Sequence, residues 1–456
     1  MCAVRLCLRL LLFIAAANVC VAQALTRPYS VPPADAPELA ARGKYSVGVR
    51  TIEIVHRDQI DILHFDKPSA KAPTYNRPLT IEIWYPAVIP QGQDARTTYQ
   101  MAAPGRNRSP DTPPYQIADV VLRDASPIAG AHFPLVIVSH GYPGSRLFLT
   151  YLTSNLASKG YVVAAIDHTD SVFGSIKGFE STLLNRASDQ LFTIQALQDL
   201  ARAPDNFLHE VLDASNVALV GYSMGGYGAL ITAGAGLNPT SPLMKFVPGG
   251  YLGDWSADSD RYKSIDRSSI KAVVAIAPWG EQPPYRAWTA QALASIRIPT
   301  LFIAGDHDDV ADYQKGIKPA FDSAVESDRC LLVYENARHN TGADPAPQNL
   351  NLTYPQMLST EEPVWRKDRI NAIDQHFITA FLDLYLKADA AKASYLHVQP
   401  TRSNEGKWAA PAPSDDTGTY STGIDKDGNP FWKGFQRRWA LGMEMYCSAA
   451  ASPQSH

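Results

Sequence analysis

The sequence contains little cysteine and little net charge. Of its 456 residues five are cysteine, and three of these, Cys2, Cys7 and Cys20, lie at the N-terminus. So few cysteines exclude a small disulfide-rich scaffold. The 41 basic and 45 acidic side chains leave a formal net charge of -4, which creates no strong field for nucleic acid or anionic lipid. We therefore expect neither as a partner.

Long apolar runs are also missing after the first two dozen residues. No later run approaches the roughly 20 apolar residues that cross a bilayer, so we expect no membrane span. The N-terminus itself has basic residues at Arg5 and Arg9, an apolar run over 10–17, and the small-residue site Ala22-Gln23-Ala24. This pattern predicts a signal peptide over 1–24, and hence an exported protein, periplasmic or secreted.

The remaining cysteines bear on the redox compartment. Cys330 and Cys447 are the two left after the signal peptide is removed, and two cysteines in an exported protein predict one disulfide. Two independent buried thiols are the alternative. Cys20 suggests a lipoprotein as an alternative form of export, but the residues before it lack the usual leucine and small side chains.

Apolar patterning predicts the fold class. Residues 45–60 and 79–85 alternate apolar and polar side chains, as half-buried strands do. Strands buried on both faces are instead continuous apolar runs, which occur at 134–138, 161–166, 217–220, 272–276, 300–304 and 331–334. Helix-period segments lie between or after them, near 145–159, 181–202, 225–235, 312–325 and 366–387. The alternation predicts an α/β domain with a doubly wound, mostly parallel sheet and an antiparallel N-terminal entry.

We place the catalytic domain at 25–388 and a C-terminal extension at 389–456. Within the domain the long connection over 237–269 carries many apolar side chains. Connections of that length are often lids or pocket walls, so we expect a lid-like insertion there. Trp432 and Phe435, together with Trp439, are expected to dock the extension on the domain.

Ser223 is the candidate nucleophile. It stands in Gly221-Tyr222-Ser223-Met224-Gly225, between a predicted buried strand and a helix-like segment. This is the G-x-S-x-G elbow in the context that it requires. A nucleophile on such a sharp turn needs neighbours without side chains, and the helix that follows directs its positive end at developing negative charge.

A serine hydroxyl needs a positioned base, and in this arrangement an acid and then a histidine follow the serine along the chain. Asp306, Asp308 and Asp309 follow the apolar run at 300–304, and His339 follows the next run. We choose Asp308, because a few residues beyond Gly305 are needed to bring a carboxylate towards His339. Asp306 and Asp309 remain open.

An oxyanion hole requires two backbone N–H donors. Met224 supplies one, as the residue after the nucleophile, and we choose Tyr142 for the other. Tyr142 lies in the loop after the run at 134–138, and the following Pro143 has no N–H to donate. We expect His140 to brace this loop by hydrogen bonding.

Together, Ser139-His140-Gly141-Tyr142, the Ser223 elbow, Gly305 to Asp308 and His339 resemble the dienelactone-hydrolase-like and platelet-activating-factor-acetylhydrolase-like group of the α/β-hydrolase superfamily. The resemblance spans roughly residues 45–385 and implies an α/β-hydrolase fold and a serine hydrolase; the group's acid three residues after the glycine supports Asp308. Dienelactone hydrolase itself has a cysteine nucleophile, so its lactone chemistry is not expected here.

The elbow is also similar to that of cutinase-type polyester hydrolases, as is a tryptophan after the strand preceding the acid, here Trp279. That resemblance implies that Trp279 contacts substrate; packing at the sheet edge is the alternative for Trp279. We also expect Tyr142 to contact substrate.

We therefore expect a serine carboxylic-ester hydrolase that forms an acyl-enzyme on a small or medium ester. A polyester hydrolase, an amidase or an acyltransferase would use the same triad, and an exported binding protein on a hydrolase scaffold is the alternative of another class. No His, Asp or Glu partners at ligand spacing accompany the 306–309 cluster, so we expect no metal and no cofactor.

Overall fold

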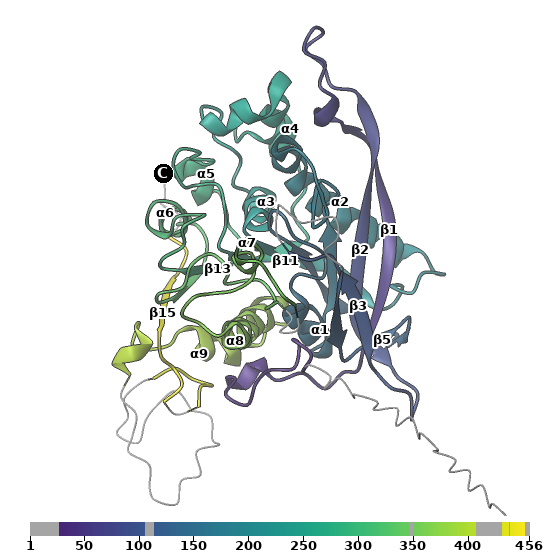
Figure 1. Cartoon of the computed structure of the whole chain (residues 1–456), viewed down its shortest axis with the longest axis vertical. Coiled ribbons are helices and arrows are strands. Elements are labelled where there is room, and N and C mark those ends of the chain that lie inside the picture. The colour runs from purple at the N-terminus through teal and green to yellow at the C-terminus, as the bar shows by residue number, and fades with distance from the viewer. Residues whose placement is uncertain (1–26, 105–113, 347–349, 407–430, 437, 452–456) are drawn as a thin grey trace, which may run out of the picture.

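The computed structural model describes residues 27–104, 114–346, 350–406, 431–436 and 438–451. The signal peptide expected at 1–24 lies outside these residues. Within them an 11-stranded mixed sheet runs through the molecule in the order β15-β14-β13-β12-β11-β7-β8-β2-β1-β5, with β6 paired to β2 (Figure 1). Its strands are β1 (Val47–Ile60), β2 (Thr74–Val88), β5 (Leu122–Arg123), β6 (Ser126–Pro127), β7 (Phe133–Ser139), β8 (Val162–Asp167), β11 (Leu212–Tyr222), β12 (Ile270–Ile276), β13 (Thr300–Gly305), β14 (Arg329–Tyr334) and β15 (Met443–Ser448).

The centre of the sheet is parallel. Consecutive strands in the series β8-β7-β11-β12-β13-β14 pair in parallel with one another, and all residues of β7 and β13 are buried. Helices cover both faces: α2 (Phe179–Arg202) and α3 (Met224–Ala233) lie above the sheet in Figure 1, and α1 (Thr150–Ser158) and α8 (Lys367–Leu386) lie below it. Burial on both faces explains the continuous apolar runs. The predicted doubly wound α/β sheet is confirmed.

The antiparallel entry is confirmed as well. Strands β1 and β2 form a long hairpin that pairs Val49 with Trp84, and β2 pairs antiparallel with β8. Along the outer part of β1 the side chains alternate between partly buried and exposed positions, because one face is open to solvent there.

The C-terminal end of the chain forms a strand that the sequence did not predict. β15 pairs antiparallel with β14 at the edge of the sheet, and a disulfide joins the paired residues Cys330 and Cys447, whose Cα atoms are 4.1 Å apart. Trp432 and Phe435 pack against Phe377 of α8 with ring centroids 5.8 and 5.9 Å apart. Residues 431–435 and 443–448 are thus held by buried aromatic rings, a strand pairing and a covalent bond.

The connection over 237–269 forms the short helices η3 (Pro242–Phe246), η4 (Pro248–Trp255) and α4 (Asp260–Lys263), with Leu243 and Leu252 buried. The segment predicted as one helix near 312–325 consists of η5 (Tyr313–Ile317) and α6 (Lys318–Ser323).

The remaining short elements are η1 (Glu38–Ala40), η2 (Ile62–His64), β3 (Thr97–Met101), β4 (Tyr115–Asp119), β9 (Ser171–Val172), β10 (Ser175–Ile176), α5 (Ala290–Ala294), α7 (Tyr354–Met357), η6 (Ala390–Lys392), α9 (Ala393–Leu396) and η7 (Ser403–Glu405). Among the helices in the described ranges, none has both the length and the apolar composition needed to cross a membrane.

Candidate active site

Ser223 occupies the sharp turn between β11 and α3. Its φ of 54° and ψ of -114° are uncommon for a residue with a Cβ atom. A Cβ atom on Gly221 would lie 2.2 Å from the carbonyl oxygen of Gly225, and one on Gly225 would lie 1.9 Å from that of Ser139. The glycines of the motif are therefore required by the close approach of three backbone segments.

A continuous hydrogen-bond chain joins Ser223, His339 and Asp308 near the carboxyl ends of β11, β13 and β14. The Nε2 atom of His339 lies 2.9 Å from Oγ of Ser223, and its Nδ1 atom lies 2.8 Å from Oδ2 of Asp308. The other oxygen of Asp308 accepts the N–H groups of Val310 and Ala311 at 2.9 and 2.8 Å. Both carboxylate oxygens of Asp308 thus accept hydrogen bonds, and the imidazole of His339 has one fixed orientation.

The other two candidate acids face elsewhere. Oδ1 of Asp306 accepts the N–H of Asn336 at 2.6 Å and contacts His307, and Asp309 forms an exposed ion pair with Arg338. The geometry brings Asp308 alone among the three into hydrogen-bond contact with His339.

The charges in this chain stabilise each other. Burial opposes the carboxylate of Asp308, but the charge and hydrogen bond of His339 and the two N–H groups hold its pKa below the ordinary value. Burial likewise opposes the imidazolium of His339, yet Asp308 first, and Asp309 and Glu362 after it, raise the pKa of His339. The site therefore stabilises the ion pair between the Asp308 carboxylate and the His339 imidazolium. A histidine becomes an imidazolium when it takes a proton from a serine.

The two predicted oxyanion donors flank Ser223. Met224 is the first residue of α3, where backbone N–H groups have no partner within the helix. Tyr142 lies in the loop after β7, which passes so close that a Cβ on Gly141 would be 3.3 Å from Cβ of Ser223. The Tyr142 hydroxyl donates to the carbonyl oxygen of Lys177 at 2.9 Å. Their role in holding an oxyanion stays a prediction.

His140 braces the loop that follows β7, as expected. Its Nε2 accepts the backbone N–H of His168 at 3.3 Å. Its Nδ1 therefore carries the proton and donates to the carbonyl oxygen of Gly141 at 2.7 Å. The guanidinium of Arg186 donates to the carbonyl oxygen of His140 at 2.6 Å. The loop is thus held at two successive carbonyl groups.

A second hydrogen-bond chain lies beneath this loop, and the sequence did not indicate it. Oγ of Ser139 lies 2.8 Å from Nε2 of His168, whose Nδ1 lies 2.8 Å from Asp189; Arg77 donates twice to the Asp189 carboxylate. Burial lowers the pKa of His168 well below the ordinary value. Because all four side chains are fully buried, no substrate reaches this chain, and its effect is to fix the end of β7.

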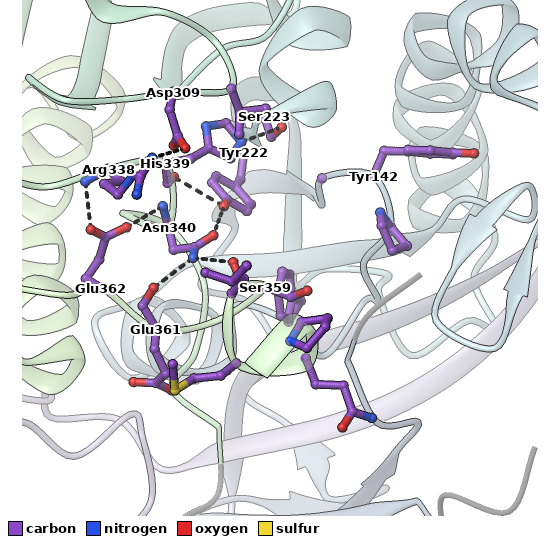
Figure 2. Close-up of a pocket in the computed structure, with 18 of the residues that line it drawn as sticks. Tyr142, Tyr222, Ser223, Asp309, Arg338, His339, Asn340, Ser359, Glu361 and Glu362 are labelled. Atoms are coloured by element: carbon purple, nitrogen blue, oxygen red, sulfur yellow. Dashed lines mark hydrogen bonds and ion pairs between the residues drawn. The ribbon is translucent and has the colours of Figure 1, made fainter. Parts of the chain in front are cut away.

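A cavity of about 710 Å³ opens beside Ser223 (Figure 2). The loop that follows β7 and the loop that carries His339 line part of it, and a segment over 354–363 lines another part. Helix α7 begins this segment, capped by reciprocal bonds between Thr353 and Gln356. We call 354–363 the pocket wall. No prediction from the sequence covered this wall, although the Thr353–Gln356 capping box is a usable helix signal.

One predicted segment and one predicted residue lie outside the cavity lining. No residue of 237–269 lines this cavity, so a lid role for that segment stays a prediction. Trp279 does not line it either; its ring packs among Tyr285, Phe179 and Tyr227 with centroids 4.6, 5.4 and 6.1 Å away. The backbone N–H of Trp279 donates to the carbonyl oxygen of Ser223 at 3.2 Å. In this geometry Trp279 is a packing residue next to Ser223.

Comparisons with known proteins agree with this architecture. Residues 119–188 match the family described as platelet-activating factor acetylhydrolase, isoform II, and residues 253–355 match the PET hydrolase-like family. Cutinase est1 of Thermobifida alba is 26% identical over 205 residues, which are 45% of this chain and 52% of that protein. Cutinase 2 of Thermobifida cellulosilytica is 24% identical over 206 residues, 45% of this chain and 59% of that protein.

A solved ferulic acid esterase from Streptomyces cinnamoneus superposes with a TM-score of 0.51 at 21% identity, over 77% of this chain and 94% of that one. At this identity the likeness concerns the fold. The chain spans about half the length of the curated relatives that it matches.

Proposed function

We propose that this protein is a serine carboxylic-ester hydrolase with Ser223 as nucleophile. Its α/β-hydrolase fold and its similarity to cutinases agree with this proposal. The observation that carries this proposal is the unbroken chain from Ser223 Oγ through His339 to Asp308 at the edge of the cavity. A serine with a base in reach, and a base oriented by a carboxylate, are the elements of nucleophilic acyl transfer.

The reaction follows from these positions. Nε2 of His339 accepts the Ser223 proton while Oγ attacks the ester carbonyl carbon, and the N–H groups of Tyr142 and Met224 stabilise the oxyanion. The C–O bond to the alcohol then breaks, and His339 returns the proton to the departing alkoxide. A water molecule, deprotonated by the same histidine, attacks the acyl carbon; the bond from that carbon to Ser223 Oγ breaks, the acid leaves, and His339 returns the proton to Oγ. Asp308 keeps Nδ1 protonated and stabilises the imidazolium throughout.

The cavity supports a small or medium ester as substrate. Its volume is within the range of small-molecule sites, and Phe148, Tyr222 and Pro143 supply apolar lining. A polyester segment is the second candidate, because Tyr354 and Leu358 of the pocket wall are 68% and 53% exposed and continue the apolar lining outward. An ester panel that varies acyl length and alcohol size, run beside a polyester film, separates the two.

The direct test of the reaction class is labelling of the mature protein with a fluorophosphonate, followed by peptide mass spectrometry. We expect one adduct, on Ser223. Failure to label would favour the non-catalytic binding protein. Product analysis with amine and alcohol acceptors distinguishes hydrolysis from acyl transfer, and an amide substrate tests for an amidase.

Export belongs to the same proposal. The disulfide between Cys330 and Cys447 suits an oxidising compartment, as does the predicted signal peptide. Expression of the full sequence in a bacterial host, followed by N-terminal sequencing, should give a mature chain that starts at Leu25.

A further inference from the structure

Glu362, at the end of the pocket wall, holds the backbone on both sides of His339. Its Oε2 accepts the N–H of Arg338 at 2.7 Å, and its Oε1 accepts the N–H of Asn340 at 2.7 Å. Figure 2 shows the carboxylate facing this loop from the wall. We propose that Glu362 is a positioning residue that holds His339 in register with Ser223 and Asp308, an inference that rests on the proposed function.

The clamp matters because His339 lies in a loop and not in a strand. The loop begins after β14, which ends at Tyr334, and the ring of His339 must satisfy two partners on opposite sides at once. The carboxylate of Glu362 forms two charge-assisted hydrogen bonds, which are stronger than neutral ones. Fixing both flanking N–H groups restricts the backbone of His339 itself.

Further bonds join the same loop to the wall and to α8. The amide Nδ2 of Asn340 donates to the carbonyl oxygens of Leu358 and Glu361, each at 2.8 Å, and Nζ of Lys367 donates to the carbonyl oxygen of Asn340. Asn340 is thus fixed from several directions. On the other side of His339, the N–H of Arg338 is held by Glu362.

Glu362 also acts on the charge of His339. The charged groups that face Glu362 are Lys367 and His339, and the carboxylates that act on His339 are Asp308, Asp309 and Glu362. Burial favours the neutral form of Glu362 and raises its pKa, although the two N–H groups and Lys367 act in the opposite sense. When ionised, Glu362 stabilises the imidazolium.

Two variants separate position from charge. Glu362→Gln removes the charge and presents an amide NH2 to one of the two N–H donors. Glu362→Asp keeps the charge, but it is one methylene shorter and cannot hold both donors as before. We expect either change to lower kcat for a short aryl ester by on the order of 10-fold or more, with KM altered about threefold or less, because small misplacements of a catalytic group are costly.

The pH profile adds a readout that a purely structural role would not move. We expect the acidic limb of kcat/KM to shift to lower pH in Glu362→Gln, by roughly a few tenths of a pH unit, and to stay in place in Glu362→Asp. Each rate is divided by the concentration of active sites, which is measured by titration with a fluorophosphonate, so partial unfolding of a variant does not lower its kcat. Glu281→Gln is the matched control, since Glu281 is equally buried, also accepts a backbone N–H, from Trp288, and lies outside the cavity lining.

Three results would overturn the inference: kcat per titrated site equal to wild type in both variants, an acidic limb that Glu362→Gln leaves unmoved, or the same kcat loss in Glu281→Gln. In each of these cases the proposed function stands as long as Ser223 is labelled in the wild type. If Ser223 is not labelled, the proposed function fails first.

Discussion

The Nε2 atom of His339 lies 2.9 Å from the Oγ atom of Ser223, although 116 residues separate the two along the chain. Ser223 follows β11 and His339 follows β14, with β12 and β13 between these strands in the sheet. The contact exists because parallel strands end at the same edge of the sheet, where such folds bind their ligands.

Ser223→Ala should abolish turnover of a short-chain aryl ester and leave the fold intact. The change removes one hydroxyl from a mostly buried side chain and keeps the β-carbon that the turn already accommodates. Initial rates and circular dichroism of wild type and variant check this. Turnover retained near the wild-type rate would contradict the assignment of the nucleophile.

Asp308→Asn should lower kcat by about 10³- to 10⁴-fold, because the histidine loses its oriented tautomer and its counter-charge. The direction of the change in the pH profile follows from the pKa of His339. His339 must be neutral to accept the serine proton, so activity falls as pH drops through its raised pKa. Burial lowers that pKa and Asp308 is the first group that raises it, so the acidic limb should move to lower pH in the variant.

The control for this prediction lies in the two neighbouring carboxylates. Alanine variants of Asp306, Asp308 and Asp309 are ranked by lost turnover, and Asp308→Ala should be the most severe. The assignment of the acid is wrong if Asp308→Ala is the mildest of the three.

Gly225→Ala should inactivate the protein and lower its melting temperature. The new Cβ would lie 1.9 Å from the carbonyl oxygen of Ser139, so either the elbow or the end of β7 must move. Gly253→Ala is the matched control, because a Cβ there meets nothing within 4 Å. Activity and thermal unfolding are measured for both; equal behaviour would show that the elbow tolerates a side chain.

Reduction of the Cys330–Cys447 bond should lower the free energy of unfolding without lowering kcat at 25 °C. The bond closes a loop of 117 residues, for which chain entropy allows about 4 to 5 kcal/mol, with roughly 2 to 4 kcal/mol typical of measured cases. Cys330 lies near the start of β14 and His339 follows its other end. Urea unfolding with and without reductant measures the change, and a Cys330→Ser/Cys447→Ser double variant should match the reduced protein.

Leu358→Ser should raise KM for esters with long acyl chains by about 5- to 50-fold, which corresponds to about 1 to 2.3 kcal/mol of lost apolar burial, and leave acetate esters unaffected. Leu358 lines the cavity and is 53% exposed without a substrate. Val364→Ser is the control, since Val364 is 67% exposed and lies just beyond the wall. If both variants have the same KM for esters with long acyl chains, the pocket wall does not contribute to substrate binding.

The sequence by itself determined the centre of the fold and the candidates for the site. The continuous apolar runs of the parallel strands are set by burial on both faces, and this is visible residue by residue in the chain. Ser223 could be found because its glycines record a local backbone need, and Asp308 and His339 because each follows such a run directly. These are properties of short segments.

Only the tertiary structure decided what surrounds those residues. Glu362 meets N–H groups 22 and 24 residues earlier in the chain, and β15 pairs with β14 across the 117 residues between Cys330 and Cys447. Glu362 carries no sequence signal for this contact, because a carboxylate that binds distant N–H groups looks like any exposed glutamate in sequence. The proposed reacting groups are local features of strand ends, whereas the wall and its clamp on His339 are non-local contacts that exist once the chain has folded.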